Sequence, residues 1–194
     1  MKVINFEQNK FDEFLESNLK DWKKSSSKIL VLGIKEGGIY IAENLYQIIN
    51  NQENKIDLKF IKCQRPSTSV KKKNEFRKSL IETIFKLSPV FILDLLRNFE
   101  HYLLTKKSIE YNREIILDES IDFKSYDKIM IVDDAVDSGV TLEKVNQYIE
   151  NLVDKTTVVK SLAVVVTNKQ AAVTPDYYLY KDVLIRFPWS LDGK

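Results

Sequence analysis

The sequence predicts an α/β fold, because short apolar runs alternate with segments of helical spacing. In one unit, residues 29–49, an apolar strand leads through a glycine-rich turn at 33–38 into a helix. In a second unit, residues 129–152, a β-branched strand meets two adjacent aspartates and a small-residue turn at 137–141 before a helix begins. A third apolar run, 156–166, reads as a long strand. Such strand–turn–helix repeats are typical of a sheet covered by helices.

The bulk composition fits one ordinary domain, which we expect to span residues 1–194. Hydrophobic residues make up 44% and charged residues 30%, as in a soluble globule. The net charge of +2 is the small difference between 30 basic and 28 acidic residues, so we expect no nucleic-acid partner. The single cysteine, Cys63, excludes an internal disulfide, and no signal peptide or membrane span is expected, which favours a cytoplasmic protein.

The stretch 128–142 carries the clearest chemical signal in the chain. Gly139 lets the backbone approach an anion closely, and the amides of Ser138 to Thr141 stand at the start of a helix, which favours negative charge. The hydroxyls of Ser138 and Thr141 add hydrogen-bond donors without adding charge. These features together predict a phosphate-binding turn.

Two adjacent carboxylates, Asp133 and Asp134, precede this turn and make the site more selective. Carboxylates beside a bare phosphate would repel it, so we expect them to face vicinal sugar hydroxyls or a divalent cation. A phosphate beside a diol or a metal describes a ribose 5-phosphate. An ordinary capped helix is the simpler alternative, but capping needs one Ser or Asp and explains neither of the paired aspartates.

The segment resembles the phosphoribosyl pyrophosphate (PRPP) motif of type I phosphoribosyltransferases, an apolar strand followed by Asp-Asp-x-x-Asp-Ser/Thr-Gly-x-Thr. The resemblance implies a twisted, mostly parallel sheet flanked by helices, with a small hood formed by the two chain ends. The implied reaction forms an N-glycosidic bond at C1 of PRPP and releases magnesium-bound pyrophosphate. Charge develops on the leaving group and on the sugar carbon, so catalysis is expected to come from positioning and electrostatics.

The resemblance also assigns roles to individual residues of the motif. Asp133 and Asp134 would hold the ribose hydroxyls directly or through metal-bound water, which makes Mg²⁺ the expected cofactor. Asp137 would be the general base for the N7 proton of a purine. The 5-phosphate would bind to Asp137, Ser138, Gly139, Val140 and Thr141.

A second anion-binding turn is expected at residues 33–38. Glycines close many βα turns for steric reasons alone, but beside the PRPP motif this turn resembles the family's pyrophosphate loop. The chain departs from the family pattern, because Glu36 stands directly before Gly37 and Gly38 where relatives often carry a basic residue. Either Lys35 supplies the positive charge or the backbone amides do most of the binding, and Glu36 could instead sit near magnesium. Arg65 joins the expected pyrophosphate contacts on its charge and loop position alone.

The C-terminal tail, residues 175–189, resembles that of 6-oxopurine phosphoribosyltransferases and ends in Phe-Pro-Trp. By that resemblance Lys169 would donate to the 6-oxo group of a purine, and the backbone around Leu184 and Ile185 would meet the base. The partners implied are PRPP and a nucleobase-like acceptor. The alternative is that the aromatic side chains of the tail simply fill the core.

Residues 74–107 do not belong to the family pattern, and their spacing predicts an inserted pair of helices. The second helix has an apolar face that includes Phe99, while four polar residues look like a solvated face: Asp94, Arg97, Asn98 and Glu100. A lid over the site or a dimerisation hairpin is the favoured interpretation, so a homodimer is expected. The lysines at 71–73 and 106–107 also leave open contact with an anionic membrane surface or a long phosphorylated ligand.

Two other functions remain open on the sequence. One is a PRPP-sensing regulator that keeps the motif but performs no chemistry. Such a regulator would normally need a DNA-binding segment, and the acid-bearing amphipathic helix expected over 6–22 is a poor one. The other is a transferase for a non-purine or lipid-linked acceptor, in which the helical insertion forms the acceptor site.

Overall fold

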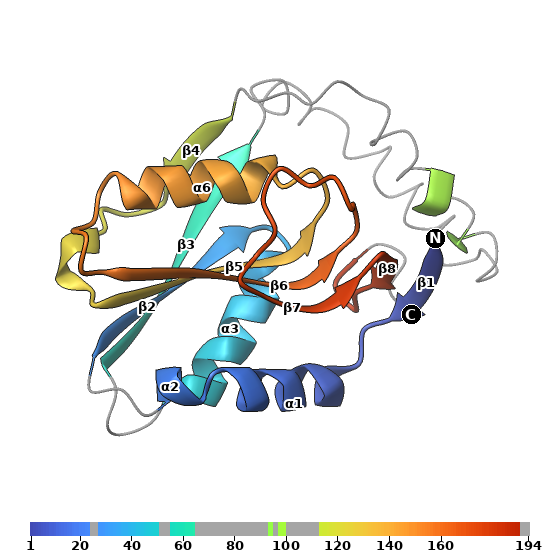
Figure 1. The fold of residues 1–194 in the computed structure, drawn as a ribbon, viewed down its shortest axis with the longest axis horizontal. Coiled ribbons are helices and arrows are strands. Elements are labelled where there is room, and N and C mark those ends of the chain that lie inside the picture. The colour runs from blue at the N-terminus through green and yellow to red at the C-terminus, as the bar shows by residue number, and fades with distance from the viewer. Residues whose placement is uncertain (24–26, 51–54, 65–92, 95–96, 100–112, 191–194) are drawn as a thin grey trace.

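A computed structural model describes residues 1–23, 27–50, 55–64, 93–94, 97–99 and 113–190 of the chain. The fold is a six-stranded sheet with helices on both faces, together with a separate two-stranded hood (Figure 1). The strand order in the sheet is β4-β3-β2-β5-β6-β7, and only β4 runs antiparallel to its neighbour. The predicted α/β class with a mostly parallel sheet is therefore confirmed.

The elements have the following bounds. The strands are β1 Lys2–Asn5, β2 Lys28–Lys35, β3 Lys55–Gln64, β4 Glu114–Leu117, β5 Lys128–Val136, β6 Val158–Val166, β7 Tyr177–Lys181 and β8 Val183–Arg186. The helices are α1 Gln8–Asn18, α2 Lys20–Lys23, α3 Gly38–Ile49 and α6 Val140–Glu150, and a short 3-10 turn η2 covers Phe123–Ser125. No helix in the described part of the chain is both long and apolar enough to cross a membrane.

The central strands are apolar on both faces, as parallel strands between two helical layers must be. Six of the eight residues of β2 are buried. Its alternate side chains enter two different cores, since Ile29 and Val31 pack with α1 and α3 while Leu30 and Leu32 pack with α6. The sheet is thus fixed between two apolar layers, and the polar ends of its strands are left for the site.

Strand β5 is longer than the apolar run 129–132 that predicts it. The sequence places the strand end at the acidic pair, but β5 continues to Val136. Pairing with β6 holds this extension in place, because Asp133 lies opposite Ala163 and Val136 lies opposite Val166. The acidic residues therefore belong to a rigid strand and not to a loop.

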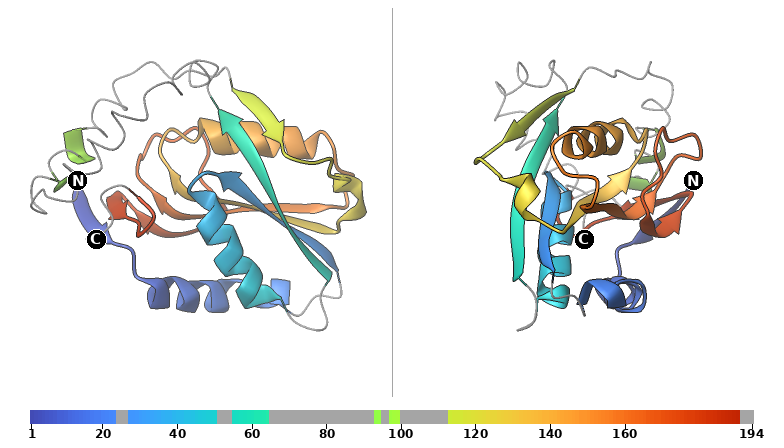
Figure 2. Two further views of the ribbon diagram at one scale, coloured as in Figure 1. Left: turned by 180° about the vertical axis from the view of Figure 1, so that it is seen from behind. Right: turned by 60° about the vertical axis from the view of Figure 1, so that its left-hand side comes forward.

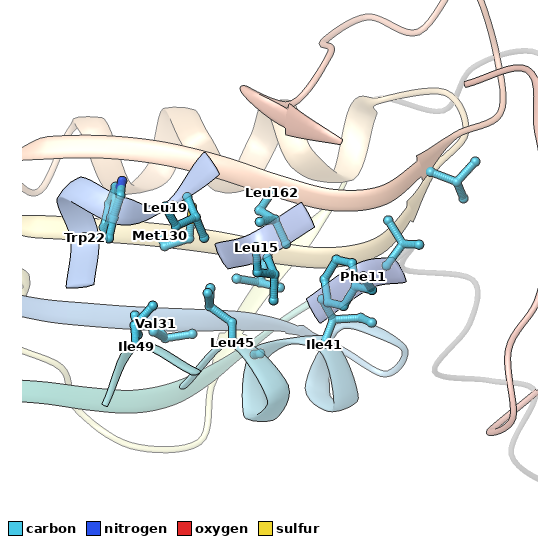
Figure 3. Packing of buried hydrophobic residues seen from close by; sticks show 14 of the residues in the cluster. Phe11, Leu15, Leu19, Trp22, Val31, Ile41, Leu45, Ile49, Met130 and Leu162 are labelled. Carbon is cyan, nitrogen blue, oxygen red and sulfur yellow. The ribbon is translucent and has the colours of Figure 1, made fainter. Parts of the chain in front are cut away.

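The N-terminal helices cover one face of the sheet (Figure 3). The buried side chains recur at helical spacing, as the predicted amphipathic stretch requires: Phe11, Leu15, Leu19 and Trp22. The stretch is not one helix, because α1 ends at Asn18 and the backbone leaves the helical conformation at Leu19, with φ −113° and ψ 27°. The single helix expected over 6–22 is wrong in that detail, although its buried face is correct.

The hood joins the two ends of the described chain. Strand β1 pairs in parallel with β8, with Val3 opposite Leu184 and Ile4 opposite Ile185. The amide of Phe6 extends the pairing by donating to the carbonyl of Arg186 at 2.9 Å. Figures 1 and 2 show this pair beyond the carboxyl ends of β5 and β6. The expected hood is confirmed, and it stands over the sheet edge where ligands bind in open α/β folds.

Candidate functional site

The turn after β5 has the shape of an anion cradle. Gly139 begins α6 with φ 77° and ψ −8°, a left-handed conformation that glycine adopts without steric cost. The turn is braced from outside, because the amide of Ala172 donates to the carbonyl of Ser138 at 2.8 Å. The brace lies so close that a Cβ atom on Gly139 would stand 2.7 Å from the backbone nitrogen of Val173.

The amides of this turn have no acceptor in the described part of the protein. Within the described residues, the backbone N–H groups of Ser138 through Thr141 donate no hydrogen bond. The first N–H groups of a helix have no partner inside the helix and carry its positive dipole end. The cradle therefore offers several aligned donors to an anion.

The acidic pair, Asp133 and Asp134, lies in the last part of β5, just before the cradle. The amide of Asp134 donates to Asp133 Oδ1 at 2.9 Å. Burial, followed by the charge of Asp134, raises the pKa of Asp133 well above its usual value. Burial also raises the pKa of Asp134, against the hydrogen bonds it receives. Two half-buried carboxylates of this kind favour a bound cation or hydroxyl donors.

The glycine-rich turn after β2 packs directly on the acidic pair. Gly38 has room only for a hydrogen, since a Cβ there would stand 2.6 Å from the carbonyl oxygen of Val132 and 3.1 Å from the Cα of Asp133. A cavity of about 590 Å³ opens at this junction. Its lining residues are Glu36, Gly37, Ile39, Tyr40, Glu43, Asp134 and Trp189. The expected pyrophosphate loop and the PRPP motif thus share one pocket.

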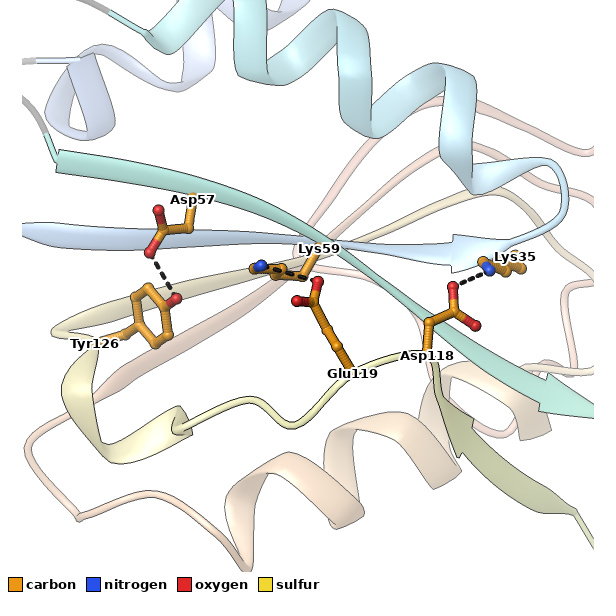
Figure 4. A network of polar contacts seen from close by, with 6 residues as sticks. All are labelled: Lys35, Asp57, Lys59, Asp118, Glu119 and Tyr126. Carbon is orange, nitrogen blue, oxygen red and sulfur yellow. Dashed lines mark hydrogen bonds and ion pairs between the residues drawn. The ribbon is translucent and has the colours of Figure 1, made fainter.

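Lys35 is engaged away from this pocket. Its ammonium group forms an ion pair with Asp118, on the loop that follows β4 (Figure 4). The peptide bond between Lys35 and Glu36 is cis, and Glu36 is exposed at the pocket. A pyrophosphate contact by Lys35 stays a prediction. Arg65, the other cation proposed for this role, lies outside the described residues.

A second cavity, of about 240 Å³, lies under the hood. Its lining residues are Arg97, Asp134, Ala135, Asp137, Val165, Thr167, Leu184, Ile185, Phe187 and Ser190. It brings together the proposed base Asp137 and the two residues expected at the nucleobase, Leu184 and Ile185. The two cavities meet at Asp134, which lines both.

Three further residues belong to the site. Thr167, buried at the end of β6, donates its hydroxyl to the carboxylate of Asp137. Tyr40 stacks on Trp189 with ring centroids 4.6 Å apart and an interplanar angle of 11°. Trp189 also stacks on Phe187 at 4.9 Å. The Phe-Pro-Trp tail is the only sequence signal for this aromatic group, and Tyr40 has none because it comes from α3.

Lys169 lies apart from both cavities. Its side chain is 76% exposed and its ammonium lies 3.4 Å from Asp182 Oδ2. A hydrogen bond from Lys169 to a purine 6-oxo group stays a prediction, since it requires a different side-chain conformation.

The polar face expected on the inserted helix is only partly exposed, and its side chains have partners in the protein. Arg186 of β8 forms an ion pair with Asp94, and the guanidinium of Arg97 donates to the carbonyl of Ile185. Asn98 accepts a hydrogen bond of 2.6 Å from the amino group of Met1. The expected solvated face is therefore wrong at 94, 97 and 98, because the hood offers charged and carbonyl partners to it. Phe99, expected on the apolar face, is 58% exposed, and Glu100 lies outside the described residues.

The fold and the turn define an α/β protein with a candidate anion cradle at the switch point of its sheet. The chain leaves β2 toward β3 on one side and returns to β5 on the other, and the cradle follows β5. The chain belongs to the phosphoribosyl transferase domain family, whose profile matches residues 8–192.

Solved structures with the same fold include a purine phosphoribosyltransferase from Pyrococcus horikoshii Ot3. It matches with a TM-score of 0.61 at 19% sequence identity, over 98% of this chain and 95% of that chain. A hypoxanthine-guanine phosphoribosyltransferase from Bacillus anthracis matches with a TM-score of 0.56 at 15% identity, over 90% and 75% of the two chains. A hypoxanthine phosphoribosyltransferase from Staphylococcus aureus gives 0.55 at 15% identity, over 90% and 71%. No curated protein matches the sequence.

Proposed function

We propose that this protein transfers ribose 5-phosphate from Mg-PRPP to a nucleobase of the 6-oxopurine class and releases pyrophosphate. The observation that carries the proposal is the meeting of the two cavities at Asp134. PRPP has a pyrophosphate on C1, a diol beside it and a phosphate on C5. The protein offers one feature for each of these groups: a glycine-rich pocket for the pyrophosphate, an acidic strand end for the diol and an anion cradle for the 5-phosphate.

The cradle and the acidic pair would hold the sugar. The amides of residues 138–141 would bind the 5-phosphate together with the helix dipole. Asp133 and Asp134 would accept hydrogen bonds from the ribose hydroxyls, so that C1 faces both cavities. Because β5 is paired with β2 up to Val132 and with β6 at Asp133, the sugar would be fixed before reaction, which lowers the entropic part of the barrier.

The donor set suits Mg²⁺. Magnesium is commonly held by one or two carboxylates together with substrate phosphates and water, and no third acidic, histidine or cysteine residue forms a metal cluster with the pair among the described residues. Asp133 and Asp134 would hold the ion, directly or through water. The bound ion would supply charge stabilisation to the departing pyrophosphate.

The cavity under the hood would hold the acceptor base. Thr167 fixes the carboxylate of Asp137 in the cavity, where it would take the N7 proton as the new bond to C1 forms. Phe187 and Leu184 supply apolar walls for a planar ring. The purine and hypoxanthine enzymes that share the fold support the choice of a 6-oxopurine.

Pyrophosphate release tests the proposal. The protein would be incubated with labelled Mg-PRPP and, separately, with hypoxanthine, guanine and xanthine. We expect release with at least one of these bases and a strong loss in Asp137→Asn, while Asp154→Asn, an exposed change at the far end of the sheet, keeps activity. Release only with another acceptor would favour the non-purine transferase, and binding of Mg-PRPP without turnover would favour the regulator.

A further inference from the structure

Arg97 reaches the cavity under the hood from the inserted segment. Its guanidinium lines the cavity and donates to the backbone carbonyl of Ile185. The two residues are far apart in the sequence, and the contact places a cation on the wall that the proposed function assigns to the nucleobase.

Several neighbouring contacts anchor Arg97 in this position. Arg186, whose side chain is only 10% exposed, forms an ion pair with Asp94, three residues before Arg97. Asn98 donates to the carbonyl of Asp94 at 2.9 Å, and Leu93 is 1% exposed. The residues before and after Arg97 are thus fixed by their own contacts. Arg97 is therefore an ordered part of the cavity wall and not a loose surface side chain.

The contact changes what the wall can recognise. A backbone carbonyl accepts hydrogen bonds, so a bare Ile185 carbonyl would suit an N–H or amino group of a base. A guanidinium has five donors, no acceptor and a fixed positive charge. With Arg97 on Ile185, this part of the wall becomes a donor edge, while the carboxylates of Asp134 and Asp137 line the same cavity.

We propose that Arg97 is a specificity-determining residue that selects a nucleobase presenting an oxo or anionic edge to the hood. The inference rests on the proposed function. Among the 6-oxopurines, xanthine carries an oxo group at C2, guanine an amino group and hypoxanthine only hydrogen. The donor edge favours xanthine, is indifferent to hypoxanthine and opposes guanine, whose amino group would face the guanidinium.

The test compares kcat/KM for the three bases at saturating Mg-PRPP in the wild type, Arg97→Met and Arg97→Lys. We expect the wild type to prefer xanthine to guanine. Arg97→Met keeps the aliphatic length but removes the donors, so kcat/KM for xanthine falls by about 10- to 100-fold. The value for hypoxanthine stays within about threefold, and that for guanine rises as the Ile185 carbonyl is released. Arg97→Lys keeps the charge without the planar fork and lies between the two.

Three results would overturn the inference: a wild-type preference for guanine, an unchanged ratio of xanthine to guanine in Arg97→Met, or an equal loss for all three bases. The last would make Arg97 merely structural. If Arg97→Met does not fold, as judged by circular dichroism, the inference is tested by the wild-type ratio of xanthine to guanine and by the reduced ratio expected in Arg97→Lys.

The outcome is separate from that of the proposed function. Turnover of all three bases without discrimination counts against Arg97 alone. Where no base is turned over, the proposed function fails, and the same comparison is made by calorimetric titration of the three bases. Absence of a xanthine preference in that titration overturns the inference as well.

Discussion

The carboxylate of Asp134 lies directly on Gly37. A Cβ atom on Gly37 would stand 2.0 Å from Oδ2 and 2.5 Å from Oδ1 of Asp134, where no real side chain fits. The absence of a side chain at 37 is therefore what allows the acidic strand end and the glycine-rich turn to share a pocket. Gly37 therefore has a steric role, because a side chain there would collide with the carboxylate proposed to hold the sugar or the metal.

Gly37→Ala should impair the site without unfolding the protein. The methyl group would push the Asp134 carboxylate aside, and because that is the end of a side chain, the fold can accommodate it. We expect the affinity for Mg-PRPP, measured by calorimetry, to fall about tenfold or more, and Tm to change by less than about 3 °C. Gly38→Ala is the contrasting control. Its Cβ would meet the backbone carbonyl of Val132 at 2.6 Å, so Tm should fall clearly. Unchanged affinity in Gly37→Ala would show that Asp134 does not contact the ligand.

Asp134→Asn should weaken Mg-PRPP binding and leave Tm near or slightly above that of the wild type. Removing one of two adjacent, half-buried carboxylates relieves their repulsion, and the asparagine oxygen can still accept hydrogen bonds, so the fold loses little, while the ligand loses a charged partner. Calorimetric titration and thermal unfolding measure the two effects. Asp154→Asn, on an exposed loop, should change neither. A large loss of stability with intact affinity would make the acidic pair structural.

Gly139→Ala should damage both the fold and the phosphate cradle. A non-glycine residue at φ 77° costs about 1–3 kcal/mol, and the new Cβ would also meet the backbone of Ala172 and Val173 at 2.7–2.9 Å. We expect Tm to fall by about 3–10 °C. Binding of ribose 5-phosphate should weaken strongly, and Gly139→Val should abolish it. Normal affinity in Gly139→Val would contradict the assignment of the cradle.

The sequence predicts those parts of the site that depend on neighbouring residues. The cradle is predicted from Gly139 and the hydroxyl residues around it. The buried strand before it is predicted from its own β-branched side chains. The length of β5 is different, because the extension through Asp133 depends on pairing with Ala163, which local composition does not reveal. Propensity thus locates the strand, whereas its end is decided by a neighbour far along the chain.

The hood and the acceptor cavity lie beyond prediction from local patterns. Residues 2–5 are too few to indicate a strand by themselves, and they become one only by pairing with 183–186. The polar side chains of Asp94 and Arg97 read as a solvated face, since polar residues at helical spacing usually are. Their partners, Arg186 and Ile185, are nearly a hundred residues away, so the inward orientation follows from the assembled fold alone.

Trp189 should report ligand binding by its fluorescence. It lines the larger cavity together with Asp134 and stacks on Tyr40, so a ligand there changes the surroundings of the indole. The other tryptophan, Trp22, is 5% exposed in the core beside α1. We expect titration with Mg-PRPP or magnesium pyrophosphate to change the emission of Trp22→Phe as in the wild type, and to leave that of Trp189→Phe constant. A persistent signal in Trp189→Phe would place the ligand elsewhere.

Asp176 should stabilise the fold at neutral pH through its contacts with β6, and this contribution should be lost in acid. Burial raises the pKa of its carboxyl, but hydrogen bonds from Lys160 Nζ at 2.7 Å and from the amide and hydroxyl of Ser161 at 2.8 and 2.9 Å outweigh burial, so the pKa is lowered. A carboxyl with a lowered pKa contributes stability above its unfolded pKa of about 3.9 and loses it as pH falls through the folded value.

Asp176→Asn should therefore cost about 1–2 kcal/mol in the free energy of unfolding at pH 7, a moderate value because the ion pair is partly exposed. Urea unfolding at pH 7 and at about pH 3 measures the difference. The gap between variant and wild type should narrow at the lower pH, where the wild-type carboxyl begins to protonate and loses its advantage. Asp154 has an exposed carboxyl without these contacts, so Asp154→Asn is the control and should show a small effect at both pH values. An equal gap at both pH values would mean that Asp176 acts through its shape and its hydrogen bonds from Ser161 alone, because a contribution from its charge must disappear as the charge does.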